Sequence, residues 1–323
     1  MFEAARRLLE PSRIHRSLTL LFALLVVTVF SAAGCAGGSG PDIALVYSFE
    51  AGDTWVHEVT TTARGTTEGL GDAAPASTDQ TTKLRVTSTV ESVDAAGTAT
   101  ISVTTETVET SEGGQTQDLT GALPQTVTVV IDKTGNVLST QGGEDAAAGL
   151  IDSGSFLDPT DLSSELNNLL FPADGTAKVG EQWTTKSTIP LTGLDQELEV
   201  TTKAKLVGVA TEDGLQVATI EYTTTMPMDL ELDLGPLFSA MLGGSDDGSG
   251  LDLVFKMTTK GSVKLSGTTK VDTSTGQAVT TQATGTMDFA IEVTEAPEML
   301  VPKDQRGPYD SAMTLEMQLV RVE

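Results

Sequence analysis

The sequence predicts a mainly β fold, in which a curved antiparallel sheet carries a few short covering helices. Threonine and glycine are abundant, while aromatic residues make up only 4% of the chain. Threonine favours strands and glycine favours turns. Apolar and polar residues alternate with a period of two in several segments, as in strands with one buried face. Short turns rich in Gly and Asp separate these segments, which is typical of antiparallel hairpins.

The first 34 residues have the layout of a bacterial signal peptide. Arginines precede an apolar run from Leu18 to Phe30, and small residues then lead to Cys35. This order predicts a lipoprotein whose signal is removed and whose first mature residue, Cys35, carries the lipid. The apolar run is about 13 residues long, shorter than the roughly 20 that a membrane-spanning helix needs. An uncleaved membrane anchor is therefore the less favoured alternative.

The expected lipid determines where the protein works. Two acyl chains on Cys35 would hold the protein firmly, because each buried methylene contributes about 0.8 kcal/mol. Residues 35–44 are rich in glycine and are expected to form a flexible tether, followed by a folded region at 45–323. The sequence therefore predicts an extracytoplasmic protein anchored to the bacterial cell membrane, or to the outer membrane where the envelope has one.

The charge of the chain excludes some partners. Without residues 1–34 it keeps 15 basic and 43 acidic residues, a formal charge of −28. Nucleic acid is excluded as a partner, because its phosphates require Lys and Arg, and adhesion to anionic lipid is disfavoured. High solubility explains the charge most simply, and binding of cations or basic partners is the functional alternative. With Cys35 as the single cysteine, no internal disulfide is expected.

The expected elements follow the chain in a simple order. Alternation is clearest in strands at residues 127–131, 251–257, 287–293 and 313–319. Turns are expected at residues 94–97, 132–136, 212–214 and 272–276. Asp158 can cap a helix that Pro172 ends, and a second helix is expected from Pro236 to Leu242. The first helix would present an apolar stripe made of Leu162, Leu166, Leu169 and Leu170.

Two motifs occur twice in the chain. The segment Gly52–Trp55 resembles Gly180–Trp183, and the turn at 132–136 resembles that at 272–276. The order is kept while the spacing drifts, as expected after a duplication. The folded region would then consist of repeats at about 45–142 and 173–322, joined by a helical segment at 144–172. Chance similarity among threonine-rich strands is the alternative.

These motifs resemble a family of secreted bacterial lipoproteins that has no assigned function. The resemblance rests on the Gly-Asp-x-Trp opening at Gly52–Trp55, on Val179–Trp183 and on the Asp-x-x-x-Gly hairpin, and covers most of residues 45–322. It implies a β-rich lipoprotein and no particular chemistry. The expected architecture also looks like that of the LolA/LolB lipoprotein carriers, in which acyl chains lie between a curved sheet and its helices. That likeness implies no particular site residues in this chain.

Catalytic signatures are few, so we expect no enzyme and no cofactor. Beyond the signal segment there is one histidine, His57, which is too few for an ordinary zinc site. The segment Leu150–Gly154, with Asp152, resembles half of an aspartic protease signature, but the second triplet that the chemistry needs is missing.

Two acidic groups could hold calcium, although no metal site is predicted. The glycine-rich loop Asp246–Asp252 lacks the spacing of an EF-hand. The second group shares one face of a strand and consists of Asp229, Glu231 and Asp233. Like charges that protect an edge strand from aggregation explain this second group better.

The candidate ligand site is an apolar surface around residues 226–242. Methionine adapts to irregular apolar partners, so this stretch and the first helix could cover a groove for an apolar or lipid-like ligand. The expected lining consists of Met226, Met228, Leu237, Phe238, Met241, Leu162 and Leu166. A filled core is the alternative. It would make the protein a structural or interaction protein of the cell envelope with an acidic surface, whose protein partners the sequence does not specify.

Overall fold

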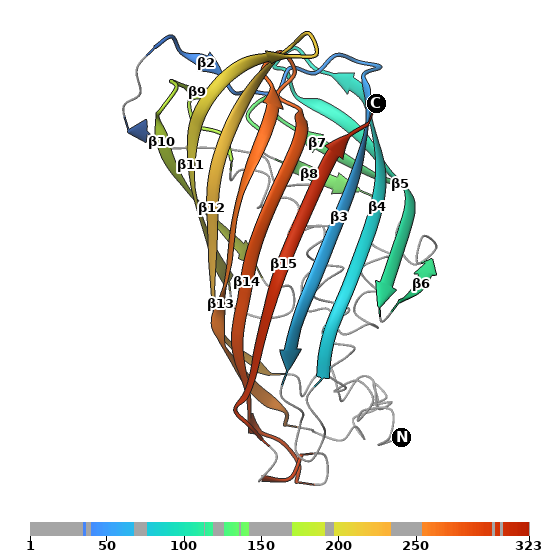
Figure 1. Cartoon of the computed structure of the whole chain (residues 1–323), viewed down its shortest axis with the longest axis vertical. Coiled ribbons are helices and arrows are strands. Elements are labelled where there is room, and N and C mark those ends of the chain that lie inside the picture. Colours follow the sequence, from blue (N-terminus) through green and yellow to red (C-terminus); the bar gives the residue numbers. More distant parts are fainter. Residues whose placement is uncertain are drawn as a thin grey trace, which may run out of the picture.

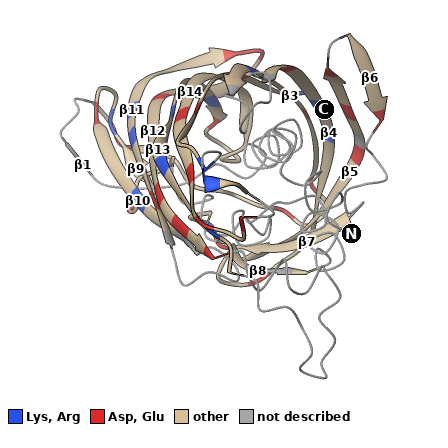
Figure 2. Ribbon diagram, turned by 90° about the horizontal axis from the view of Figure 1, so that it is seen from below, with Lys and Arg blue, Asp and Glu red and all other residues tan. Residues whose placement is uncertain are grey.

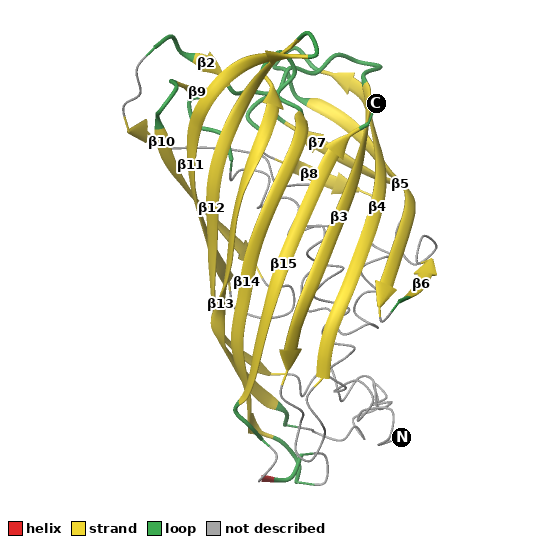
Figure 3. Cartoon of the chain, viewed as in Figure 1, coloured by secondary structure: helices red, strands yellow, loops and turns green. Residues whose placement is uncertain are grey.

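The computed structural model describes residues 35–36, 40–67, 76–112, 114–118, 126–135, 137–141, 170–190, 197–233, 254–298, 301–303 and 306–322. These ranges contain strands and turns but no α-helix (Figure 3). The strands are β1 (Cys35–Ala36), β2 (Ile43–Ala44), β3 (Thr54–Thr67), β4 (Ala76–Val93), β5 (Ala99–Glu112), β6 (Gln115–Asp118), β7 (Thr126–Ile131), β8 (Val137–Gln141), β9 (Thr176–Ala177), β10 (Gln182–Pro190), β11 (Glu197–Glu212), β12 (Leu215–Asp233), β13 (Lys256–Asp272), β14 (Ala278–Glu295) and β15 (Tyr309–Arg321).

The mainly β, antiparallel character predicted from the sequence is confirmed. The expected covering helices are not part of the described structure, because the segments 158–169 and 236–242 lie outside the described residues. Leu170 and Phe171, at the end of the first of these segments, are buried and not helical. The sheet is therefore the whole of the regular structure in the described ranges, apart from the small β2–β9 pair.

Thirteen strands form one antiparallel sheet in the order β1-β10-β11-β12-β13-β14-β15-β3-β4-β5-β7-β8, with β6 paired to β5 (Figure 1). The strands β3–β8 and β10–β15 each follow one another along the sheet, and the two groups meet where β15 pairs with β3. Among the described strands no pairing joins β1 to β8, so the sheet is not closed.

The sheet curves around an interior, as the view along the strands shows (Figure 2). Most side chains on the side that faces the interior are buried or half-buried, and we call this side the inner face. Along β15 every second residue from Tyr309 to Leu319 is buried, and those between are exposed. Glycines on the inner face allow tight curvature, because a Cβ at Gly261 would overlap the carbonyl oxygen of Asp288 on β14. Glycine thus lets neighbouring backbones approach closely.

Apolar clusters lie along the inner face: a small one consists of Trp55, Val90, Ala99 and Ile101, and two larger ones hold most of the core of the described residues. The first of the larger clusters joins both groups of strands to the segments before β3 and β10, and includes Leu45, Val59, Leu84, Leu170, Phe171, Trp183, Leu206, Ile220, Met317 and Leu319. The second lies further along the central strands and consists of Ala63, Val263, Met287, Phe289, Met313 and Leu315, with Met226, Met228 and Ile291 packed against it. Burial of these side chains is the main force that holds the curved sheet together.

The sequence motifs that occur twice have the same local geometry in both places. Gly52 and Gly180 both have positive φ, of 96° and 88°. The next residue in each motif accepts a hydrogen bond on its carboxylate from the backbone N–H three residues earlier, at 3.1 Å for Asp53 and 2.7 Å for Glu181. A duplication remains a prediction, but the two segments start their strands in the same way.

Candidate functional site

The register aligns the inner-face residues in transverse rows that run from strand to strand. One such row, which we call the methionine row, consists of Met226, Val263, Met287, Met313, Gly65 and Thr78. Met287 and Met313 are buried, and Met226 is half-buried. Met228 lies one row further along, opposite Gly261. Flexible thioether side chains fill irregular gaps and adapt to varied apolar partners, so this part of the inner face suits an alkyl chain.

Polar side chains lie beside the methionine row, at the boundary between the two apolar clusters. One row there consists of Thr185, Thr202, Thr224, Leu265, Gly285, Leu315, Ala63, Gln80 and Glu112. The next row consists of Trp183, Ala204, Tyr222, Gly267, Ala283, Met317, Thr61, Thr82 and Thr110. We call the following set the polar belt: Thr61, Gln80, Thr82, Thr110, Thr185, Thr202 and Thr224.

Some members of the polar belt bond to one another. The hydroxyls of Thr82 and Thr110 lie 3.0 Å apart, and those of Thr202 and Thr224 lie 2.8 Å apart. Cross-strand hydroxyl pairs of this kind satisfy polar groups that burial has removed from water.

Three members of the belt have buried polar atoms without a hydrogen-bond partner in the described structure. They are the amide nitrogen and oxygen of Gln80 and the hydroxyls of Thr61 and Thr185. Gln80 and Thr61 are each 1% exposed, and Thr185 is 8% exposed. A buried unpaired polar group costs about 1–3 kcal/mol, so each of these groups needs an explanation.

The two inner-face groups with a shifted pKa are held neutral at pH 7. Burial raises the pKa of Tyr222, although its hydrogen bond with the Thr269 side chain acts the other way. Burial also lowers the pKa of His57, whose Nε2 donates to the carbonyl oxygen of Ala278 at 3.1 Å. His57 therefore packs inside the sheet, and no Ser or Asp beside it forms a catalytic arrangement among the described residues.

The structure brings together only part of the predicted ligand lining. Met226 and Met228 lie on the inner face beside the second apolar cluster. The other members of that prediction, Leu237, Phe238, Met241, Leu162 and Leu166, lie outside the described residues.

The predicted lipid-bearing cysteine lies at one edge of the large sheet. The backbone of Cys35 is the partner of Trp183 in the β1–β10 ladder. The start of the expected mature chain is thus a short strand, and the tether expected at residues 35–44 includes this paired segment and β2.

The acidic strand face is solvent-exposed. Asp229, Glu231 and Asp233 alternate with buried or half-buried residues on β12, and Asp229 and Asp233 lie opposite Lys260 and Lys256. Pairing of β12 with β11 ends at Thr225, so this stretch has a described partner strand on one side only. That agrees with the edge-strand interpretation.

Metal and membrane-spanning features are absent from the described ranges. No group of three or more His, Cys, Asp or Glu side chains there could hold a metal ion. Likewise, no helix in these ranges is sufficiently long and apolar to cross a bilayer. Asp152 and the loop Asp246–Asp252 lie outside the described residues.

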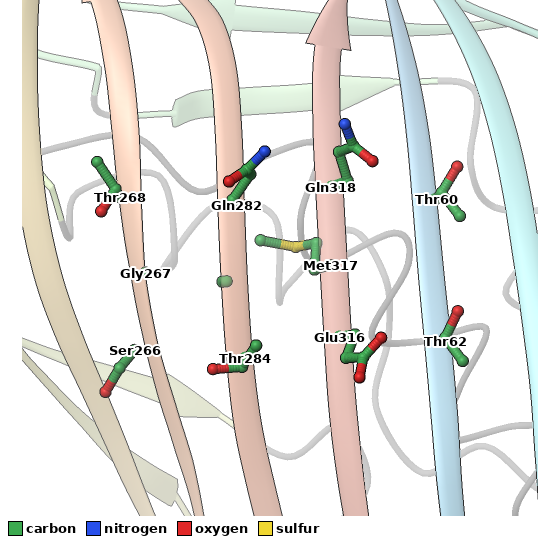
Figure 4. Close-up of a pocket in the computed structure, with 11 residues that line it drawn as sticks. Thr60, Thr62, Ser266, Gly267, Thr268, Gln282, Thr284, Glu316, Met317 and Gln318 are labelled. Carbon is green, nitrogen blue, oxygen red and sulfur yellow. The ribbon is translucent and has the colours of Figure 1, made fainter.

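A shallow hollow lies on the outer face of the central strands, with a volume of about 480 Å³ (Figure 4). Its lining consists of Thr60, Thr62, Ser266, Gly267, Thr268, Gln282, Ala283, Thr284, Glu316, Met317 and Gln318. Glu316 lies 3.6 Å from the guanidinium of Arg64. The lining contains no aromatic ring and no unpaired buried polar atom, so it is a weaker candidate than the inner face.

The polar belt was not predicted from the sequence. Gln80 lies in the segment Ser77–Thr82, which is polar throughout. Without apolar residues at alternate positions, the pattern does not show which side chains point inward. The one available signal is the alternation further along the same strand, where Leu84 and Val86 are buried, because extending it backwards places Gln80 on the inner face.

Comparison with known proteins assigns no family. No protein-family model matches the sequence, and no curated protein matches it. The structure is weakly similar to DynF from the dynemicin biosynthesis pathway of Micromonospora chersina, with 7% identity, a TM-score of 0.19 and coverage of 90% of this chain and 88% of that one. OmpF of Salmonella typhi in complex with daunomycin has 7% identity and a TM-score of 0.25, with coverage of 83% of this chain and 98% of that one. A loop-deletion mutant of OmpT, an outer membrane protein of Vibrio cholerae, has 12% identity and a TM-score of 0.23, with coverage of 84% of this chain and 100% of that one. At TM-scores this low, the similarity carries no information on function.

Proposed function

We propose that the chain is a lipid-anchored extracytoplasmic lipoprotein of a bacterial envelope that binds an apolar or lipid-like ligand against its inner face. Binding would involve no covalent chemistry and no cofactor. Cys35 would carry the membrane anchor, and the methionine row with Met228 would contact the ligand.

The methionine row is the observation that carries this proposal. Three of its six members are methionines on β12, β14 and β15, and Met228 lies beside them. An aliphatic core that specifies a single packed state is built mainly from Leu, Ile and Val, whereas Met is preferred on adaptable apolar surfaces. The curvature of the sheet places this row on its concave side, where an alkyl chain would be shielded from water (Figure 2).

Photolabelling in membranes tests this proposal on the full chain. Membranes that contain the protein are incubated with a long-chain alkane bearing a diazirine and are then irradiated. The labelled peptides are identified by mass spectrometry. We expect label on peptides from the inner face of β12 to β15, with a severalfold lower yield in Met226→Gln. The matched control is Thr225→Gln, because Thr225 is the exposed neighbour on the same strand.

Absence of specific labelling would contradict ligand binding. The result would then favour the second class of function, a structural or interaction protein of the envelope that uses its acidic surface. The charge of −28 that remains without residues 1–34 is the feature that supports that alternative.

A further inference from the structure

We propose that Gln80 and Thr61 form the polar end of the ligand site, and that the ligand is a neutral amphipathic lipid. This inference rests on the proposed function. Such a lipid has a long alkyl chain that ends in a hydroxyl or amide group, each of which both donates and accepts a hydrogen bond. Its alkyl chain would lie along the methionine row, and its polar group would bond to the Gln80 amide and the Thr61 hydroxyl.

The register places the two polar side chains next to each other. Gln80 on β4 is the partner of Ala63 on β3, and Thr61 on β3 is the partner of Thr82 on β4. The two are therefore diagonal neighbours on the same face, with Cα atoms about 7–8 Å apart. A glutamine side chain can bridge much of that distance, so one small polar group could contact both.

The burial of these groups requires a partner. Both polar atoms of the Gln80 amide and the Thr61 hydroxyl are shielded from solvent, and the described residues offer none of them a hydrogen bond. In contrast, Thr82 and Thr110 on the same side of the sheet satisfy each other. A ligand with one donor and one acceptor would fit an amide that presents one of each.

The charges near the belt select a neutral ligand. In the two rows that contain the belt, the ionisable residues are Glu112 and Tyr222, and neither is a cation. A phosphate or carboxylate would be buried there without Lys or Arg, which is costly. The lysines of the neighbouring strands, such as Lys83 and Lys264, point outward and are exposed.

The neighbouring residues supply the apolar part of the site. Ala63 and Leu315, beside Gln80 in its row, belong to the second apolar cluster, as do Met287 and Met313 in the methionine row. A ligand whose polar group reaches Gln80 would therefore meet apolar side chains in the direction of β14 and β12.

Competition in the photolabelling assay tests the inference. The labelled alkane is competed with oleyl alcohol, 1-octadecene and oleate, which share chain length and differ in the end group. One lost neutral hydrogen bond corresponds to about tenfold in affinity. We expect oleyl alcohol to compete at a concentration about tenfold lower than 1-octadecene, and oleate to compete no better than 1-octadecene.

Two variants assign the selectivity to these residues. Gln80→Met keeps the length of the side chain but removes both polar atoms. In this variant oleyl alcohol and 1-octadecene should compete at nearly equal concentrations, so that the selectivity ratio, the competing concentration of 1-octadecene divided by that of oleyl alcohol, falls close to one. Thr61→Val should lower the ratio in the same direction. Gln282→Met on the outer face is the matched control and should leave the ratio unchanged, since Gln282 is exposed. Without ligand, Gln80→Met should melt at the same temperature as the parent chain or higher, because it removes an unpaired buried amide.

The outcomes separate this inference from the proposed function. If no alkane labels the inner face, the proposed function fails. If labelling is specific but the ratio is unaffected by Gln80→Met, or if oleate competes best, the inference is wrong and the proposed function stands. A fall in the melting temperature of Gln80→Met would show that the protein itself satisfies the amide, and would also overturn the inference.

Discussion

The indole Nε1 of Trp183 donates a hydrogen bond to the carbonyl oxygen of Leu170 at 2.9 Å. Trp183 is the second residue of β10 and is 2% exposed, and Leu170 lies in the segment that precedes β9. This bond fixes a non-strand segment against the inner face, where Leu170 and Phe171 complete the first apolar cluster.

Trp183→Phe should therefore destabilise the protein more than Trp55→Phe. Trp183→Phe removes the hydrogen bond and leaves the buried carbonyl of Leu170 unpaired, so we expect the free energy of unfolding to fall by about 2–3 kcal/mol. Trp55 stacks on Phe49 with 6.5 Å between ring centroids, and a phenyl ring keeps much of that contact, so about 1 kcal/mol is expected. Urea unfolding measures both, and equal losses would show that the Leu170 bond contributes nothing.

The inner-face glycines should resist substitution where the sheet curves. In Gly261→Ala the new methyl group would overlap the carbonyl of Asp288 and the backbone of Phe289, so we expect a loss of about 1–3 kcal/mol. Gly208→Ala is the matched control, because a Cβ there meets nothing within 4 Å and should change stability by less than about 0.5 kcal/mol. Chemical unfolding of both variants provides the comparison, and a harmless Gly261→Ala would contradict the described curvature.

Protonation of His57 should destabilise the folded protein in mild acid. Burial lowers the pKa of His57 in the folded state, whereas the unfolded chain keeps a pKa near 6.5. Below about pH 6.5 the unfolded state binds the proton first, so the free energy of unfolding falls until the folded pKa is reached, by up to about 1.4 kcal/mol per pH unit. In His57→Gln, the free energy of unfolding followed from pH 7.5 to 5.0 should not show the fall that protonation of His57 causes. Parallel curves for the two chains would refute the prediction.

Lipid attachment at Cys35 should be visible by metabolic labelling. Cells grown with labelled palmitate should incorporate it into the protein, and Cys35→Ala should abolish the label because no other cysteine is present. Ala36→Gly is the control and should keep the label. An unlabelled protein that remains in the membrane with residues 1–34 attached would instead support the uncleaved anchor.

Local features of the fold could be predicted from the sequence because they depend on neighbouring residues. The turn expected at residues 212–214 joins β11 to β12, and Asp213 and Gly214 have φ of 50° and 86°. Positive φ at both positions is the mark of a type I′ hairpin, which favours Asp-Gly. The alternation at residues 313–319 likewise gives the correct buried face of β15.

The pairing of distant strands could not be predicted in this way. β15 lies beside β3, and the hydroxyl of Thr314 bonds to the carbonyl oxygen of Arg64 across 250 residues of sequence. An alternating pattern shows which face of a strand is buried but not which strand lies next to it. The methionine row and the Gln80–Thr61 pair exist only through such pairings, so their residue types can be read from the chain but their arrangement cannot.

The most direct test of ligand binding is to identify what the protein carries. The chain with residues 1–35 replaced by a cleavable secretion signal would be purified from bacteria and examined by native mass spectrometry, and any bound molecule would be extracted and identified. We expect a near-stoichiometric apolar or amphipathic lipid, whose amount falls in Met226→Gln and is unchanged in Thr225→Gln. A protein that is free of lipid and remains so after incubation with oleyl alcohol and 1-octadecene would contradict ligand binding.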